Sequence, residues 1–270
     1  MPGDLPLGRP TRYTDQYDPT LLHPIERAAS RAALGRPGAM PFRGEDVWNA
    51  WDLTWLTPQG QPRAAVAVIR VPASSTHIIE SKSMKLFLNS LSMTPFDDDA
   101  ALARQLSDDL AQSAGGEVTV AIERPDSPGL TVNALAGRNL DRLTVACTRY
   151  EPDASLLATG ADTVDDETLY THAFRSLCPV TGQPDLGSVA IRYSGTTIEP
   201  AALLRYLVSF RRHEDFHEAC VERMFIDIVE HCAPERLSVY ARFQRRGGID
   251  INPFRTNVDE SAANLRLWRQ

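Results

Sequence analysis

The sequence predicts an α+β fold built from two tandem modules of similar order. Apolar residues alternate with polar ones in several segments, which predicts strands, and recur at helical spacing in others. The order strand, strand, helix, helix, strand occurs in the first half of the chain and again in the second. A shared order favours a duplicated module, although an unrelated α+β protein can show the same order by chance. We expect an N-terminal arm at residues 1–45, a first module at 46–151 and a second module at 152–270.

Prolines recur through residues 1–45 and limit this arm to short elements. The alternation of apolar residues in 47–55 resumes in 64–68, and the segment PQGQP at 58–62 turns the chain between them. This pattern predicts a β-hairpin.

Two helices and two strands are expected to complete the first module. Asp97 and Asp98 are suited to cap the second helix, and Gly115 is suited to end it. The expected helices span 83–91 and 98–114, and the expected strands span 118–122 and 143–147. The second module repeats the order with strands near 168–177 and 188–193, helices near 201–210 and 214–232, and a strand at 237–243.

The composition is that of an ordinary globular protein with a small-molecule partner. A chain of 270 residues with 43% hydrophobic content can bury a core without disulfides. Its four cysteines form no Cys-x-x-Cys pair and no apolar leader opens the chain, so we expect a reducing, cytoplasmic location. No run approaches the roughly 18 apolar residues of a membrane span. The net charge of -7 argues against a broad nucleic-acid surface.

Cys178 is the strongest candidate for a catalytic residue. It ends an expected strand and opens the turn CPVTGQPD (178–185), which can bring the carboxylate of Asp185 beside the thiol. A thiolate is the nucleophilic form of cysteine, and a nearby carboxylate can carry a proton. The alternative is that Cys178 is a small buried apolar residue, as most cysteines of soluble proteins are.

Three further segments combine residue types that suit a binding site. The segment ESKSMK (80–85) joins one carboxylate and two ammonium groups, His217-Glu218 pairs a titratable ring with a carboxylate, and RRGG (245–248) joins two cations to flexible backbone. A solvated helix start, a surface His-Glu pair and two solvated arginines are the plainer explanations. No Gly-x-Gly-x-x-Gly follows a strand, so a dinucleotide would bind here without a Rossmann fingerprint.

One segment matches a different class of enzyme. His213-Glu214-x-x-His217 has the spacing of zinc peptidases, in which two histidines one helical turn apart bind the metal and the glutamate acts as base. The charges of Arg211 and Arg212 oppose a cation at this position, and the assignment leaves Cys178 without a role.

Four segments together resemble the 7-cyano-7-deazaguanine reductases, the NADPH-dependent nitrile reductases of the queuosine pathway. They are residues 80–90, 178–188, 216–218 and 245–253. The order is that of the long, two-module form of the family. The resemblance implies a tunnelling fold, in which ββαα modules with antiparallel sheets and helices on one face assemble into a barrel. It also implies a reaction without a metal.

The resemblance also assigns individual roles. It makes Cys178 the nucleophile that forms a covalent thioimide with the nitrile, and Asp185 the proton donor. It implies that the deazapurine is held by Ile79, Glu80, Ser81, His217 and Glu218, and that NADPH is held by Ser81, Lys82, Arg246 and Gly247.

We therefore expect a cytoplasmic, homodimeric reductase that converts 7-cyano-7-deazaguanine to 7-aminomethyl-7-deazaguanine and binds no nucleic acid directly. Two other classes remain open at this stage. One is the zinc metallopeptidase centred on His213 and His217, and the other is a non-catalytic purine- or pterin-binding module. Metal analysis would reveal the first, and a failure to oxidise NADPH would reveal the second.

Overall fold

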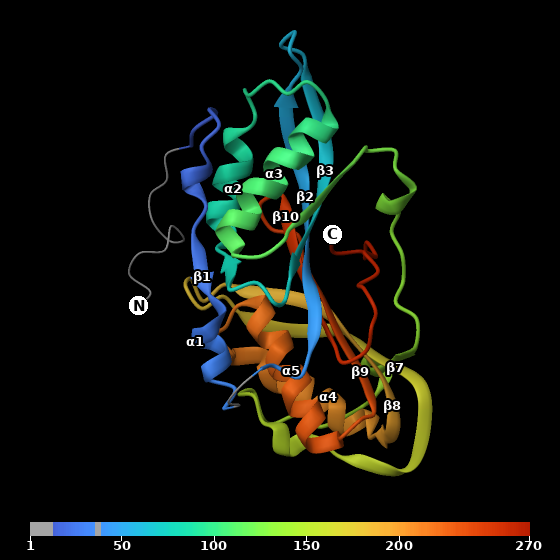
Figure 1. Ribbon diagram of the computed structural model, residues 1–270. Helices are drawn as coiled ribbons and strands as arrows, with labels where there is room; N and C mark the ends of the chain where they lie inside the picture. Colours follow the sequence, from blue (N-terminus) through green and yellow to red (C-terminus); the bar gives the residue numbers. More distant parts are fainter. Residues whose placement is uncertain (1–12, 36–38) are drawn as a thin grey trace. The chain divides into compact units, whose positions relative to one another are not determined.

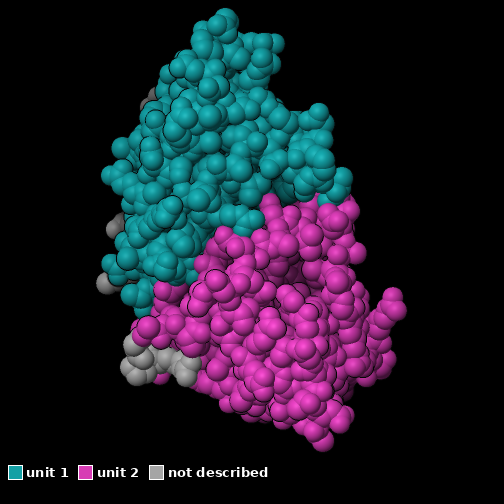
Figure 2. Space-filling model, turned by 45° about the vertical axis from the view of Figure 1, so that its right-hand side comes forward, with its two compact units in different colours: residues 1–30, 46–131, 245–251 teal, residues 31–45, 132–244, 252–270 magenta. Residues whose placement is uncertain are grey.

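The computed structural model describes residues 13–35 and 39–270, which fall into two compact units. Unit 1 comprises the described residues up to Ser30 together with 46–131 and 245–251 (Figure 2). Unit 2 comprises the described residues of 31–45 together with 132–244 and 252–270. The expected arm therefore contributes to both units, and its residues 1–12 and 36–38 lie outside the described part.

Unit 1 contains the predicted hairpin, β2 (Arg43–Leu56) and β3 (Pro62–Pro72). The predicted strand at 118–122 is β5 (Thr119–Glu123), which pairs antiparallel with β3, so the order is β5-β3-β2, followed by the first residues of β10 (Ile249–Thr256). A separate pair joins β1 (Pro24–Glu26) to β4 (His77–Ile79), and the short helix α1 (Arg27–Ala32) follows β1 directly.

Both predicted helices of the first module are present, as α2 (Ser81–Ser90) and α3 (Asp99–Ala114). The Asp98 side chain accepts the N–H of Ala101 at 2.7 Å, and Gly115 ends α3 in the left-handed conformation. The helices lie beside β2 and β3 (Figure 1), and their apolar faces form one core with these strands. The buried side chains at this contact include Trp48, Trp55, Ile69, Met84, Phe87, Leu102, Leu106 and Leu110.

Unit 2 is a sheet in the order β10-β9-β8-β7-β6, covered on one face by α4 and α5 (Figure 1). The long hairpin of β7 and β8 pairs antiparallel and carries three register shifts, β8 and β9 pair antiparallel, and β6 joins β7 in parallel. The bounds are β6 (Arg138–Asn139), β7 (Thr159–Leu177), β8 (Pro184–Ile198), α4 (Pro200–Ser209), α5 (His217–Cys232) and β9 (Arg236–Phe243). Short 3-10 turns occur at Pro19–Leu21, Pro128–Leu130, Leu140–Arg142, Ala154–Leu156 and Phe210–Arg212.

Two predictions for segments of unit 2 are corrected by the structure, and one further strand was not predicted. Residues 143–147 form no strand, because Leu143 and Val145 pack on the core of unit 2 while their main chain stays outside the sheet. Helix α5 begins at His217 rather than at residue 214, since the preceding residues bond to the end of β7. Strand β10 was not expected, because its sequence IDINPFRT contains a proline and polar residues.

No helix in the described ranges is long and apolar enough to cross a membrane.

Candidate active site

Cys178 lies in a closed turn between β7 and β8. Its N–H donates to the carbonyl of Gln183 at 2.9 Å, and its own carbonyl accepts the N–H of Gly182 at 2.9 Å. Gly182 has φ 66, a conformation that suits glycine. These bonds let the two strands meet again at once, with Leu177 opposite Pro184. Cys178 is 8% exposed, so the residue is buried.

The register of the hairpin brings Asp185 to the same face as Cys178. Asp185 lies directly opposite Ser176, and side chains of a cross-strand pair point to one face of a sheet. Cys178 follows Ser176 by two residues, which is the spacing of side chains that share a face. Asp185 is only 3% exposed, and its Oδ2 lies 3.8 Å from Nε2 of His217.

The first turn of α5 is held against the same strand end. The N–H of Leu177 donates to the carbonyl of His213 at 2.8 Å, and the N–H of Asp215 donates to the carbonyl of Leu177 at 3.2 Å. These two bonds make residues 213–215 a short continuation of the sheet, and α5 begins directly afterwards with His217 and the buried Glu218. The structure therefore brings the predicted residues Cys178, Asp185, His217 and Glu218 to one end of unit 2.

Two residues at this end were not expected from the sequence as parts of a site. The ring of Phe243, at the end of β9, meets the His217 imidazole edge to face, with centroids 3.9 Å apart. The thiol of Cys220 is fully buried on α5, and burial, with smaller effects from Asp215, Asp185 and Glu218, raises its pKa well above the usual value. In the sequence both read as core residues, because aromatic and apolar spacing was the only pattern around them.

The predicted residues Ile79, Glu80 and Ser81 lie at the junction of β4 and α2 in unit 1. Glu80 is fully buried and caps α2, because its two carboxylate oxygens accept the N–H groups of Lys82 and Ser83, each at 2.8 Å. The first turn of α2 thus fixes the orientation of the buried Glu80 carboxylate.

Arg246 and Gly247 form a tight turn in unit 1. The N–H of Arg246 donates to the carbonyl of Ile249 at 2.8 Å, and Gly247 has φ 60. A Cβ at Gly247 would come within 3.1 Å of Cε of Lys85, so the lysine stem passes directly over the bare glycine. Lys85 follows Lys82 by three residues on α2, which places both on neighbouring positions of one helix side. Lys85 was part of the segment recognised in the sequence, but its contact with Gly247 was not predicted.

The geometry required for the zinc peptidase alternative is not present. That arrangement needs both histidines on one helix, one turn apart, and α5 begins only at His217. His213 instead ends a 3-10 turn and lies 3.6 Å from a carboxylate oxygen of Asp215. Across residues 13–35 and 39–270 there is no cluster of three or more His, Cys, Asp or Glu side chains able to hold a metal ion.

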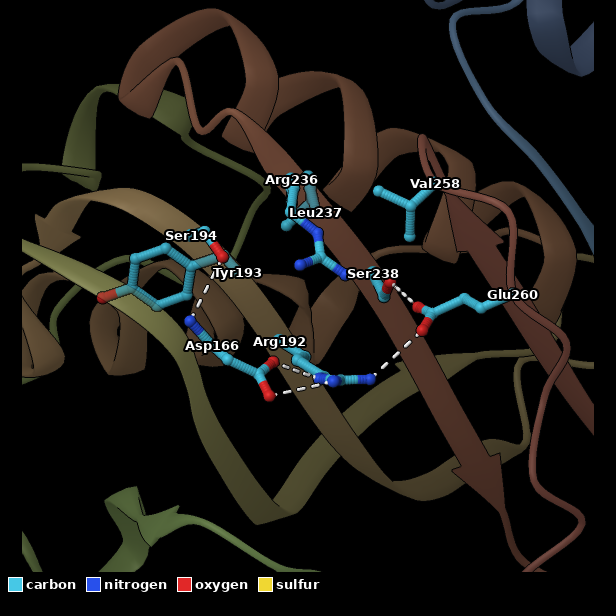
Figure 3. Close-up of a pocket in the computed structure, with 9 residues that line it drawn as sticks. All are labelled: Asp166, Arg192, Tyr193, Ser194, Arg236, Leu237, Ser238, Val258 and Glu260. Carbon is cyan, nitrogen blue, oxygen red and sulfur yellow. Dashed lines mark hydrogen bonds and ion pairs between the residues drawn. The ribbon is translucent and has the colours of Figure 1, made fainter.

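A pocket at the other end of the β7–β8 hairpin is filled by ion pairs (Figure 3). Arg192 binds the carboxylate of Asp166 through two nitrogens and reaches Glu260 at 3.1 Å, and Glu260 also accepts the hydroxyl of Ser238. Asp166, Arg192 and Glu260 thus pair with one another in this pocket, which Arg236 also lines. The candidate active site is the Cys178 end of the hairpin, where Asp185 and His217 also lie.

Comparisons with known proteins agree with the resemblance read from the sequence. Residues 13–122 match the family model described as "Nitrile reductase, 7-cyano-7-deazaguanine-reductase N-term", and residues 184–262 match the model described as "QueF-like protein". Proteins named NADPH-dependent 7-cyano-7-deazaguanine reductase are similar over their whole length. The protein of Burkholderia vietnamiensis is 50% identical over 100% of this chain and 99% of its own. That of Chromobacterium violaceum is 47% identical over 100% and 98%, and that of Azoarcus sp. is 50% identical over 96% and 92%. The chain therefore belongs to the 7-cyano-7-deazaguanine reductase family.

Proposed function

We propose that this chain reduces the nitrile of 7-cyano-7-deazaguanine to the primary amine of 7-aminomethyl-7-deazaguanine, a step of queuosine biosynthesis. The reaction consumes two NADPH and two protons and yields two NADP⁺. The carrying observation is a buried thiol at a turn whose register puts an almost fully buried carboxylate on the same face, beside a histidine. The names and full-length similarity of the relatives support the substrate and the cofactor.

In this mechanism the Cys178 thiolate attacks the nitrile carbon. A carbon–sulfur bond forms, one π pair of the nitrile moves to nitrogen, and that nitrogen takes a proton from Asp185 to give a neutral thioimide. The adduct is a better hydride acceptor than the nitrile. When bound, NADPH supplies the two hydrides that reduce the thioimide and then the imine released from sulfur.

Carboxylates suit the base that this chain would hold. The ring N–H and exocyclic amine of a guanine-like edge are donors, and leaving them unpaired in a closed pocket costs about 1–3 kcal/mol each. Glu80 and Glu218 are buried acceptors of this kind. We propose Ile79, Glu80 and Ser81 of unit 1 and His217 and Glu218 of unit 2 as base-binding residues.

For NADPH we propose Ser81, Lys82, Arg246 and Gly247. The fit rests on unit 1, where the turn at Arg246 exposes glycine backbone directly under the Lys85 stem. Ammonium and guanidinium groups around bare backbone are a common setting for phosphate.

The deciding experiment follows NADPH absorbance with the cyano base as substrate. We expect oxidation that stays unchanged after exhaustive chelation, and a covalent adduct on Cys178 when the base is added without NADPH. Cys178→Ala should give neither adduct nor turnover while it still binds the base. Mass spectrometry that maps the adduct to Cys147, Cys220 or Cys232 would overturn the assignment. Binding of the base without any NADPH oxidation would identify a non-catalytic module.

We further infer that the chain is a tunnelling fold of two tandem modules, at 46–151 and 152–270, that pairs with a second copy. A barrel of this kind needs more modules than one chain supplies, and symmetric pairing is the commonest way to close one. Light scattering should give the mass of a dimer, and a monomer at working concentration would contradict the inference. The four free thiols and the acidic charge support a cytoplasmic enzyme that acts on a free base rather than on nucleic acid.

A further inference from the structure

The side chain of Gln270 is buried in unit 2, and both its amide oxygen and its amide nitrogen form hydrogen bonds there. It is 8% exposed. Its Oε1 accepts from the Arg242 guanidinium, at 3.2 and 3.0 Å, and from the N–H of Leu267 at 2.9 Å. Its Nε2 donates to the carbonyl of Phe243 at 3.2 Å and to Oδ1 of Asn252 at 2.7 Å. A primary amide has two donor hydrogens, and both are directed at the end of β9 and the middle of β10.

These bonds fix the main chain of Phe243 through side chains. The N–H of Phe243 donates to Oδ1 of Asn252 at 3.2 Å, and its carbonyl accepts from Gln270. Main-chain pairing of β9 with β10 is seen further along, at Tyr240 with Phe254. At Phe243 the side-chain amides of Asn252 and Gln270 therefore form the hydrogen bonds that a neighbouring strand would otherwise provide. On the other side of Phe243, Gly187 of β8 lies opposite.

The ring of Phe243 connects Gln270 to the candidate active site. It meets the His217 imidazole edge to face, with an interplanar angle of 78° and centroids 3.9 Å apart. At that distance a shift of the strand end moves the ring into the imidazole or away from it. His217 in turn lies 3.8 Å from Asp185. Gln270 is thus connected to His217 through one backbone carbonyl and one ring.

We propose that Gln270 is a positioning residue for base binding: its amide holds Phe243 so that the ring sets the angle of His217. The inference rests on the proposed contact of His217 with the base. It predicts a defect in base affinity, without a defect in NADPH affinity, when the amide donors are removed.

The test uses Gln270→Glu, which keeps the shape of the side chain and the acceptors for Arg242 but replaces both donor hydrogens by carboxylate oxygen. Base affinity is measured by calorimetry in the Cys178→Ala background, where no adduct can form, and NADPH affinity is measured in parallel. Loss of one or two hydrogen bonds that act through a neighbour should weaken base binding about three- to tenfold. NADPH affinity should stay unchanged.

A double-mutant cycle separates positioning from a general structural role. In a His217→Ala background, Gln270→Glu should have no further effect on base affinity, because the group that it positions is gone. The matched control is Trp268→Ala, whose side chain is 62% exposed in the same segment and which should bind the base as the parent does. Additive effects of Gln270→Glu and His217→Ala, or equal losses of base and NADPH affinity, would overturn the inference.

Two outcomes keep this test distinct from that of the proposed function. If His217→Ala leaves base affinity intact, the contact of His217 with the base is wrong and the inference falls with it, although turnover by Cys178 stands. If Gln270→Glu does not fold, Phe243→Leu replaces it, because that change keeps both amide bonds to the main chain and removes only the ring edge. Phe243→Leu should weaken base binding by a similar factor, and parental affinity in this variant would refute the proposal.

Discussion

Asp185 carries a carboxylate that is almost sealed from water yet lies on the face of the sheet that Cys178 shares. Asp185→Asn keeps the shape and removes the acid, so the thiol remains and the proton transfer is lost. We expect the rate of NADPH oxidation to fall by roughly 10²–10⁴-fold, the usual contribution of a positioned acid or base. Base affinity in the Cys178→Ala background serves as the control and should change little. A rate within twofold of the parent would exclude Asp185 as the proton donor.

Arg246 is expected to affect the cofactor alone. One charge-assisted contact to phosphate contributes about 1.5–3 kcal/mol, so Arg246→Ala should weaken NADPH binding roughly 10- to 150-fold. Fluorescence titration of NADPH measures this directly. The exposed Arg63, at the start of β3, provides a charge-matched control, and Arg63→Ala should leave the affinity unchanged. An unaltered affinity in Arg246→Ala would remove this residue from the cofactor site.

At the residue scale, much of the candidate site could be proposed from the sequence, because residue types suited to catalysis occur there at a short spacing. The thiol at a turn and the carboxylate seven residues later are visible in CPVTGQPD, and the hairpin register puts them on one face. Phe243 and Gln270 were not readable, because their importance depends on which strand end lies beneath His217. No local pattern records that relation.

Among the elements, the end of α3 offers the clearest test of a local prediction. Gly115 has φ 65, and a Cβ at this position would come within 2.1 Å of Oγ1 of Thr76. Gly115→Ala should therefore cost more than the roughly 1–2 kcal/mol that a left-handed alanine costs by itself. Urea denaturation provides the measurement.

The matched control for this change is Gly60→Ala in the β2–β3 turn. Gly60 has φ 80, but nothing lies within 4 Å of its hypothetical Cβ. Gly60→Ala therefore measures the cost of the left-handed backbone conformation without a steric clash. Equal losses of stability in the two variants would show that the contact with Thr76 relaxes freely.

Elements with strong periodicity and clear end residues were predicted well, and those set by tertiary partners were not. Helices α2 and α3 follow from their apolar spacing and from Asp98 and Gly115. Strand β10 is an element set by its tertiary partners. Its buried polar residues find partners only in the folded chain, as Asp250 does with the side chains of Asn49 and Trp51. Residues 143–147 alternate like a strand because one side of an extended segment covers a core.

At the scale of the whole molecule, Glu222 joins three separate parts of unit 2. Its carboxylate accepts hydrogen bonds from Arg31 and from Arg255, whose side chain is completely buried. Removing one partner of a buried ion pair leaves a buried charge uncompensated and typically costs about 3–5 kcal/mol. Glu222→Gln should lower the stability to urea by an amount of this order. Asp259→Asn is the surface control, since the Asp259 partner of Arg43 is almost fully exposed and such pairs contribute about 0–1 kcal/mol.

The pKa of the Glu222 carboxylate predicts how the stability of the protein changes in acid. Burial opposes the charge of Glu222, but the guanidinium groups of Arg255 and Arg31 outweigh it and lower its pKa. A group whose pKa is lower when folded stabilises the protein above its unfolded pKa, and this contribution fades as the pH falls through the folded value. The stability difference between parent and Glu222→Gln should therefore be full near neutrality and shrink below about pH 4.5. A difference that is constant down to strong acid would contradict this account.

Leu177 bonds through both its N–H and its carbonyl to the residues that lead into α5. The strand that leads to Cys178, the proposed nucleophile, and the helix that carries His217 and Glu218 are thus joined by the same pair of hydrogen bonds. Loss of these two bonds would free both segments, so thermal opening of this region would disturb the proposed nucleophile and the proposed base contacts together. A partly opened enzyme that still carries an aligned thiol but has lost its hold on the base is disfavoured by this arrangement.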